Sequence, residues 1–210
     1  MSPRLPTPTA TLVRTLRQGV AGLDPVTRDR LHATLAAKAA TAGLLDVAYR
    51  TVDSPLGSLL LATTEVGLVR VAFAVEGHDD VLGRLAADVS PRILAAPQRL
   101  DDAARQLDDY FARRRRHFDL PIDLRLAHGF RRTVLEHLPD IPYGSTASYA
   151  AVAGASGNPA AVRAAASACS HNPLPLVVPC HRVVRSDGSI GNYLAGTAAK
   201  QALLDLEAAA

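Results

Sequence analysis

A cysteine and a histidine stand next to each other in residues 179–183, which read Pro-Cys-His-Arg-Val. A thiol attacks only as its thiolate, so its ordinary pKa of ~8.5 has to be lowered by a nearby base or cation. His181 is the usual kind of base for that task, and Arg182 is a source of positive charge. The alternative for the pair alone is a small buried cysteine beside a solvated histidine. The apolar run at 176–178 predicts a strand that leads into this segment.

The segments around Cys180 decide between these two interpretations. They read IPYGSTASY at 141–149, NPAAVRA at 158–164, HNPLP at 171–175 and GSIGNYLAG at 188–196, followed by Lys200, two leucines at 203–204 and Glu207. In order, spacing and identity, these segments resemble the O6-alkylguanine-DNA alkyltransferases, also called methylated-DNA–protein-cysteine methyltransferases. The resemblance is dense over 128–207 and looser over 47–122, where SPLG at 54–57, YF at 110–111 and FDLP at 118–121 also match.

The resemblance implies an α+β fold with three parts. Residues 47–122 would form a ribonuclease-H-like α/β domain that supports the rest of the protein. Residues 123–210 would form a helical domain with a winged helix-turn-helix, which binds DNA and holds the active site. Residues 1–46 have no counterpart in the family, and we expect them to be a helical N-terminal extension whose first nine residues are disordered.

Composition limits the class of protein. The 210 residues allow one large domain or two small ones, and the net charge of +3 with a pI near 9.1 permits an anionic partner. The chain has two cysteines, no signal-peptide pattern and no apolar run of membrane length. We therefore expect a cytoplasmic protein with free thiols and no membrane contact. No cysteine or histidine cluster has the spacing of zinc ligands, so we expect no metal.

The pattern of apolar and turn residues predicts most of the secondary structure. In the extension, a helical pattern over 11–20 is followed by Asp24 as an N-cap and Pro25 at the first position of a helix that ends near Gly43. This helical hairpin could serve as packing material, a dimer contact or an extra DNA-contacting arm. Beyond it we expect strands at 47–52, 58–63 and 67–73, then helices at 79–88 and 100–115.

The C-terminal part is predicted to be mostly helical. We expect a helix from Phe130 that ends at Pro139, a short helix that begins at Ser148, and a third helix capped by Asn158 and Pro159 that runs to Ser170. A last helix covers 197–206. The second and third helices, joined by a glycine-containing turn, are typical of a helix-turn-helix.

The third of these helices carries almost no long side chains. Its small residues include Ala161, Val162, Ala164 and Ala166, and its single long side chain is Arg163. Such a surface cannot read bases in the major groove, but it permits close approach to the minor groove. The resemblance implies that Arg163 is a finger that fills the place of a nucleotide flipped out of the duplex. The alternative is an ordinary solvated arginine.

The resemblance also implies the chemistry. Cys180 would attack the alkyl carbon on O6 of guanine, His181 would act as its base through a water molecule, and Glu207 would orient the histidine. Glu207 lies 26 positions beyond His181, so the sequence alone does not show that they meet. The product is a thioether that no nearby group can hydrolyse. We therefore expect a single-turnover enzyme that needs no cofactor.

Further residues are assigned to the pocket by the same resemblance. Asn172 would bond the backbone around Cys180 or simply cap its helix, and the carbonyls of Cys180 and Val183 would accept from the guanine amine. Lys200 would support the pocket or lie on the surface. Three more positions are assigned to the pocket. Tyr149 would contact the flipped guanine, Tyr193 would stack along the alkyl group, and Leu194, beside the pocket, stands where relatives carry a smaller residue.

The expected function is repair of double-stranded DNA that contains O6-alkylguanine, chiefly the methyl adduct, with O4-alkylthymine as a secondary substrate. We expect a monomer. One alternative is a module that binds the lesion without transferring the alkyl group, but such modules lack the cysteine. Another is a transcriptional regulator that alkylation switches, but the extension has no cysteine to act as a second acceptor. The four arginines at 113–116 are either a solvated helix end or a phosphate-contacting patch.

Overall fold

The computed structural model describes residues 24–208, and the chain divides into two compact units, Met1–Leu44 and Leu45–Ala210. The expected helix over 11–20 and the expected disorder of residues 1–9 lie outside the described residues. In the first unit the described element is α2 (Pro25–Thr41), and the Asp24 carboxylate accepts a hydrogen bond from the Thr27 amide at 3.0 Å. The predicted cap, with proline at the start of the helix, is confirmed.

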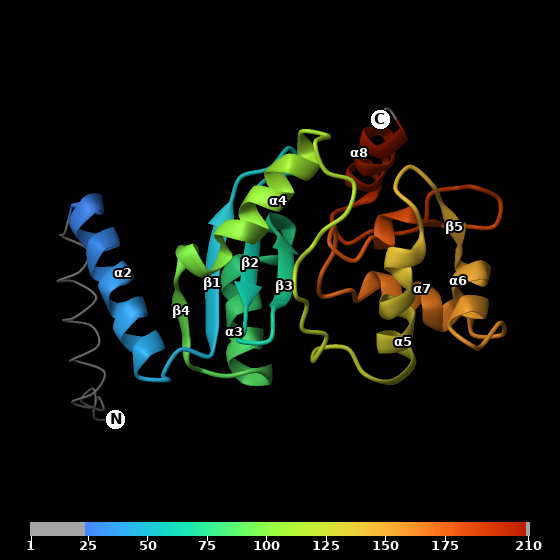
Figure 1. Ribbon diagram of the computed structural model, residues 1–210. Coiled ribbons are helices and arrows are strands. Elements are labelled where there is room, and N and C mark those ends of the chain that lie inside the picture. The colour runs from blue at the N-terminus through green and yellow to red at the C-terminus, as the bar shows by residue number, and fades with distance from the viewer. Residues whose placement is uncertain (1–23, 209–210) are drawn as a thin grey trace, which may run out of the picture. The chain divides into compact units, whose positions relative to one another are not determined.

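The second unit begins with a four-stranded sheet in the order β3-β2-β1-β4 (Figure 1). Its strands are β1 (Val47–Val52), β2 (Leu59–Thr63), β3 (Leu68–Phe73) and β4 (Ile93–Ala95). The first three are antiparallel neighbours close to their predicted bounds, whereas β4 pairs in parallel with β1 and was not predicted. With three residues, β4 is too short to show a period of two, and its partner rather than its own sequence makes it a strand.

Helices cover both faces of this sheet. They are α3 (His78–Asp88), which follows the 3₁₀ turn η1 (Ala74–Glu76), and α4 (Asp101–Phe111), which follows η2 (Pro97–Leu100). Alternate residues of a strand point to opposite faces, so Leu60 packs with Leu85 of α3 while Leu59 packs with Leu107 of α4. This arrangement explains why all five residues of β2 are buried.

Helix α4 is shorter than predicted. The sequence pattern extends to residue 115, but the helix ends at Phe111, and Arg113 has a left-handed φ of 60°. Because of that reversal, the arginines at 113–116 lie in the loop beyond the helix rather than in its last turn.

The C-terminal half of the unit is mostly helical, as predicted. Its elements are α5 (Gly129–His137), η3 (Leu138–Asp140), β5 (Ala147–Ser148), α6 (Tyr149–Ala155), α7 (Val162–Ser170), η4 (Cys180–Arg182), β6 (Val183–Val184) and α8 (Thr197–Ala208). The Ser148 hydroxyl accepts from the Ala151 amide at 3.1 Å and so caps α6, as predicted. Helices α5, α6 and α7 pack on a shared set of buried residues: Val134, Leu135, Val152, Ala153, Ala165 and Ala168.

Two local predictions in this half are wrong. Helix α7 begins at Val162 rather than after Pro159, because residues 158–161 form a turn that the Ala161 amide closes onto the Asn158 carbonyl at 3.0 Å. Ala161 is therefore the N-cap of the helix and not a residue within it.

The segment before Cys180 is a compact turn and not the predicted strand. The Val178 amide bonds to the Leu174 carbonyl at 2.8 Å, and Leu176 has a left-handed φ of 74°. Leu174, Leu176 and Val178 are nonetheless buried. The apolar run thus indicated burial correctly, but an apolar run alone does not identify a strand.

The sheet and the C-terminal helices of the second unit share one hydrophobic core. It includes Leu61 of β2, Leu107 of α4, Leu135 of α5 and Leu203 of α8. Among the described helices, none is long and apolar enough to cross a membrane.

This core predicts that residues 45–210 fold without the first unit. Leu45 and the Asp46 carboxylate, which bonds Ser90 at 2.6 Å and Arg92 at 2.8 Å, are retained in such a fragment. We expect circular dichroism and a thermal melt to show one cooperative transition, with a midpoint a few degrees below that of the full chain. A fragment that does not unfold cooperatively would show that the first unit is needed for folding.

Candidate active site

Cys180 lies buried at the start of η4, with an exposed fraction of 3%. Burial raises the pKa of its thiol to about 11, and the side chain of Asn172 and the charge of Lys200 only partly offset that rise. The thiol is therefore protonated at neutral pH and needs a base before it can attack.

His181 is completely buried and bonded on one side only. Its Nε2 lies 2.8 Å from Oε1 of Glu207, whereas its Nδ1 has no hydrogen-bond partner among the described residues. A carboxylate only accepts, so Nε2 carries the proton and Nδ1 keeps its lone pair. Burial lowers the pKa of His181, although Glu207 acts in the opposite direction. The ring is thus a neutral base whose free nitrogen is Nδ1.

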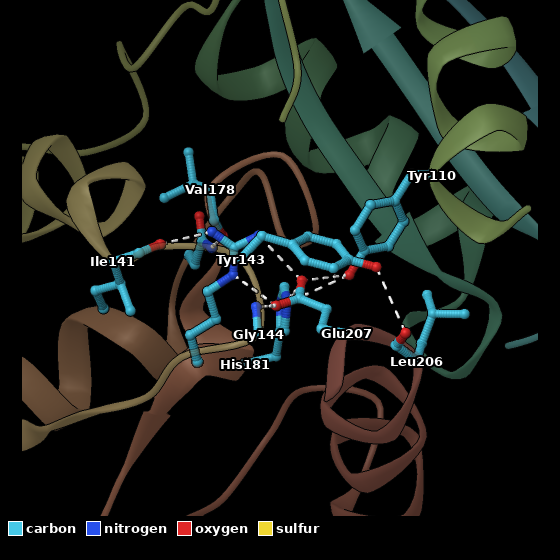
Figure 2. Close-up of polar contacts among 10 residues, drawn as sticks. Tyr110, Ile141, Tyr143, Gly144, Val178, His181, Leu206 and Glu207 are labelled. Carbon is cyan, nitrogen blue, oxygen red and sulfur yellow. Dashed lines mark hydrogen bonds and ion pairs between the residues drawn. The ribbon is translucent and has the colours of Figure 1, made fainter. Parts of the chain in front are cut away.

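The carboxylate of Glu207 is surrounded by hydrogen-bond donors (Figure 2). Its Oε1 accepts from Tyr110 at 2.7 Å, from His181 at 2.8 Å and from Nη2 of Arg182 at 3.0 Å. Its Oε2 accepts from Nε of Arg182 at 2.9 Å and from the Gly144 amide at 3.1 Å. Burial opposes the charge, but the bonds from His181 and Arg182 outweigh it and hold the pKa of Glu207 at about 2. The structure thus brings together the two residues that the sequence leaves 26 positions apart.

Tyr110 was not among the predicted site residues, and Arg182 was expected to add positive charge near the thiol. Arg182 also donates from Nη1 to the Ile141 carbonyl at 2.7 Å and lies 5.7 Å from the centre of the Tyr143 ring, so its contacts are with Glu207 and its surroundings rather than with the thiol. Tyr110 comes from α4. The Cys-His pair next to Arg182 and the Tyr-Phe pair at 110–111 marked both segments as similar to the family, but neither pattern indicates a contact with Glu207.

Asn172 fixes the turn that precedes the cysteine. Its Nδ2 donates to the Val178 carbonyl at 2.8 Å, and its Oδ1 accepts from the Leu174 amide at 2.9 Å. The predicted bond from Asn172 to the backbone near Cys180 is therefore present. His171 is the C-cap of α7, and Asn172 follows it directly. The end of α7 is thus tied to the turn that carries the thiol.

Lys200 is an interior residue. It is completely buried, its ammonium group donates to the Val183 carbonyl and lies 5.8 Å from the centre of the Tyr149 ring, and burial lowers its pKa. The interpretation of Lys200 as a surface lysine is therefore wrong. A carbonyl oxygen has two lone pairs, so Val183 can still accept a second bond.

Two tyrosines lie close to the thiol. A Cβ at Gly191 would overlap the hydroxyl of Tyr149, so the chain passes this ring only because residue 191 is glycine. Burial raises the pKa of Tyr149 to about 12, with smaller contributions from Cys169 and Cys180. The hydroxyl of Tyr193 is buried without a partner among the described residues. Both phenols therefore stay protonated at neutral pH.

Leu194 does not lie beside the thiol with the two tyrosines. It is partly buried against the core and, with Asn172 and Pro173, lines a cavity of about 320 Å³ whose lining does not include Cys180. This cavity faces α3 and β3, from which Leu85 and Arg70 reach it.

The start of α7 presents a smooth exposed surface. Val162, Arg163 and Ala164 are exposed, whereas Ala161 and Ala166 are half-buried. Among the described residues Arg163 has no hydrogen bond or ion pair, so its side chain is available to a partner. Two of the arginines in the loop at 113–116 do have partners. Arg114 pairs with Asp109 at 2.7 Å, and Arg115 pairs with Asp119 at 2.9 Å.

The network predicts a particular pH dependence of stability for Glu207→Gln. The pKa of Glu207 is lowered in the folded state, so its stabilising effect is complete above the ordinary carboxyl pKa and is lost as the pH falls toward about 2. Breaking a buried charged network should lower the free energy of unfolding at pH 7 by about 3 kcal/mol. Denaturant titrations should show this difference shrinking between roughly pH 4.5 and pH 2.

Glu136→Gln is the matched control, because Glu136 forms an exposed pair with Arg132 at 2.8 Å. We expect a change of less than about 0.5 kcal/mol at any pH. A difference between Glu207→Gln and the parent that stays constant with pH would contradict the account of Glu207.

Comparisons with known proteins agree with this geometry. Residues 129–209 match the family model "6-O-methylguanine DNA methyltransferase, DNA binding domain", and residues 47–124 match its "ribonuclease-like domain". A methylated-DNA–protein-cysteine methyltransferase of Mycolicibacterium paratuberculosis is 40% identical over 161 residues, which cover 77% of this chain and 92% of that protein.

Solved structures give the same result. The O6-methylguanine methyltransferase of Mycobacterium tuberculosis is 36% identical, with a TM-score of 0.69 over 78% of this chain and 93% of that one. The structure of the same organism's OGT in complex with DNA is also 36% identical, with a TM-score of 0.67 over 77% and 93% of the two chains. The predicted fold class is confirmed, and the chain belongs to the methylated-DNA–protein-cysteine methyltransferase family.

Proposed function

We propose that this protein repairs DNA by moving an alkyl group, chiefly methyl, from O6 of guanine to Cys180 in a single turnover. The observation that carries the proposal is the position of His181, next to the cysteine in the chain. One of its ring nitrogens bonds to a buried carboxylate, and the other has no hydrogen-bond partner in the part of the chain that the structure describes. Family membership and the likeness to a relative solved with DNA support the same conclusion.

The first step is loss of the thiol proton. It passes from Sγ of Cys180 to Nδ1 of His181 through a water molecule, and the resulting imidazolium is stabilised by the Glu207 carboxylate. A group with a pKa of about 2 does not take the proton itself. Glu207 therefore acts by orienting the ring and by compensating its charge, as a carboxylate does in a nucleophile–base–carboxylate triad.

The second step is in-line displacement at the alkyl carbon. A bond forms between Sγ and carbon while the bond between carbon and O6 breaks, and its electron pair goes to the guanine. That base needs a donor as negative charge develops on it. The hydroxyl of Tyr149 is protonated and packed against Gly191, which suits this role.

Carbonyl groups near the thiol would recognise the guanine. Those of Cys180 and Val183 already accept one bond each, from the Val183 amide and from Lys200 respectively. Each keeps one lone pair for the exocyclic amine of guanine, which adenine lacks. Tyr193 would stack along the alkyl group. The size of Leu194, which follows Tyr193 in the chain, would restrict bulky adducts even though the cavity that its side chain lines does not include Cys180. O4-alkylthymine would be a secondary substrate.

The start of α7 would contact the DNA. Its small side chains, Ala161, Val162, Ala164 and Ala166, allow the backbone to approach the minor groove without reading sequence. The unpartnered side chain of Arg163 would occupy the place of the flipped nucleotide. The partner is therefore double-stranded DNA that contains the alkylated base.

The remaining assignments follow from this scheme. We propose a monomer, and a reaction that ends in a thioether needs no cofactor. Both cysteines are free, which suits the cytoplasm. We assign residues 47–122 to support and residues 123–210 to DNA binding and catalysis. Residues 1–46 are an extension outside the chemistry.

Cys180→Ser tests the nucleophile. A serine hydroxyl is not ionised near neutral pH, so we expect no transfer from duplex DNA that carries O6-methylguanine. Intact-protein and peptide mass spectrometry should show the parent gaining one CH₂ group on the Cys180 peptide. Cys169→Ser, a change at the other buried cysteine, should still transfer the group. Methylation of the Cys180→Ser protein would refute the assignment, and a parent that binds the lesion but gains no mass would indicate a binding module.

Arg163→Ala tests the finger. Repair of duplex DNA should slow by at least about tenfold, because the flipped state loses the group that fills the stack, whereas dealkylation of the free base should change little. Arg105→Ala is the control, since Arg105 is an exposed arginine of α4 paired with Asp102. Equal losses on both substrates would remove Arg163 from this role.

A further inference from the structure

One contact of the active site comes from the ribonuclease-like half of the protein. Tyr110 belongs to α4, is completely buried, and donates its hydroxyl to Oε1 of Glu207 at 2.7 Å (Figure 2). The same hydroxyl lies 3.4 Å from Nε2 of His181. The half that the family resemblance marks only as support thus reaches the histidine–carboxylate pair.

Aromatic packing holds the Tyr110 hydroxyl in place. The centre of the Tyr110 ring lies 5.5 Å from the ring centre of Phe111, 5.3 Å from that of Phe118 and 6.1 Å from that of Tyr143. Burial and the neighbouring charge of Glu207 raise the pKa of Tyr110 far above its ordinary value. The phenol therefore remains a donor at every pH at which the protein is folded.

The hydroxyl competes with the histidine for one oxygen atom. Oε1 of Glu207 accepts from Tyr110, His181 and Nη2 of Arg182, although a carboxylate oxygen has two lone pairs. A donor at this atom both limits how the carboxylate can rotate and reduces the charge that it presents to the imidazole. Tyr110 is therefore placed to control the bond that keeps the proton on Nε2.

We propose that Tyr110 is a positioning residue for alkyl transfer, which fixes Glu207 so that His181 presents Nδ1 toward Cys180. The inference rests on the proposed function. It adds that the ribonuclease-like half completes the catalytic relay, in addition to packing against the other half.

The groups that face His181 determine how loss of the Tyr110 hydroxyl changes the protonation of the imidazole. They are Glu207 and Lys200 from α8, Arg182 and Cys180 from η4, and Tyr110 from α4. Without the Tyr110 hydroxyl, Glu207 interacts more strongly with the imidazole and stabilises its protonated form. Protonated His181 cannot accept the thiol proton, so the acid limb of the rate profile should move to higher pH.

Tyr110→Phe isolates the hydroxyl, because phenylalanine keeps the ring and its packing. The measurement is the rate constant of methyl transfer to Cys180 from duplex DNA between pH 5 and pH 9, followed by mass spectrometry. We expect the rate constant on the pH plateau to fall about tenfold. The midpoint of the acid limb should move to higher pH by roughly 0.5–1 pH unit. In a His181→Ala background, the same change should have no further effect on the residual rate, because Tyr110 acts through the histidine.

Tyr143→Phe is the matched control. Its ring belongs to the same aromatic cluster, but its hydroxyl contacts the Leu206 carbonyl at 3.5 Å and not Glu207, so the acid limb should stay at the parental pH. A Tyr110→Phe protein with the parental profile would overturn the proposal, and so would a slower protein whose acid limb has not moved. A parent that transfers no methyl group to Cys180 would instead refute the proposed function.

Discussion

The burial of the Glu207 carboxylate is the constraint on which the rest of the site depends. An ionised carboxylate removed from water is strongly destabilising unless donors replace the lost hydration. Here the donors come from three separate segments, α4, the loop at Gly144 and η4, and the carboxylate itself belongs to a fourth, α8. Because these segments must converge to stabilise one charge, they also fix the ring of His181 next to Cys180.

Cys180 is itself buried, and this burial keeps its thiol in the protonated form. A cysteine with a pKa of about 11 is almost entirely protonated at neutral pH, and a neutral histidine beside it is not yet charged. In the proposed mechanism, thiolate forms only together with imidazolium, which Glu207 stabilises. A thiol held in its protonated form is a poor target for alkylating agents and oxidants, because the thiolate is the reactive species.

Local signals in the sequence predicted local structure well. Asp24 and Ser148 begin helices because a short polar side chain there accepts from a free amide, and the three antiparallel strands follow their alternation and turns. The turn at 174–178 was misjudged as a strand, because its leucines report burial and not backbone geometry. Arg182 was assigned to the thiol rather than to Glu207, and Tyr110 was missed, for another reason. Their roles depend on Glu207, which lies 25 and 97 positions away in the chain, and no local pattern encodes such contacts.

The protonation state of His181 tests the account most directly. Nitrogen-15 chemical shifts of the labelled imidazole, recorded on the free protein at pH 7, distinguish a protonated ring nitrogen from one with a lone pair. The account predicts a neutral ring with the proton on Nε2, bonded to Glu207, and a lone pair on Nδ1. A ring with the proton on Nδ1, or an imidazolium with both nitrogens protonated, would leave Cys180 without its base and would contradict the proposed mechanism.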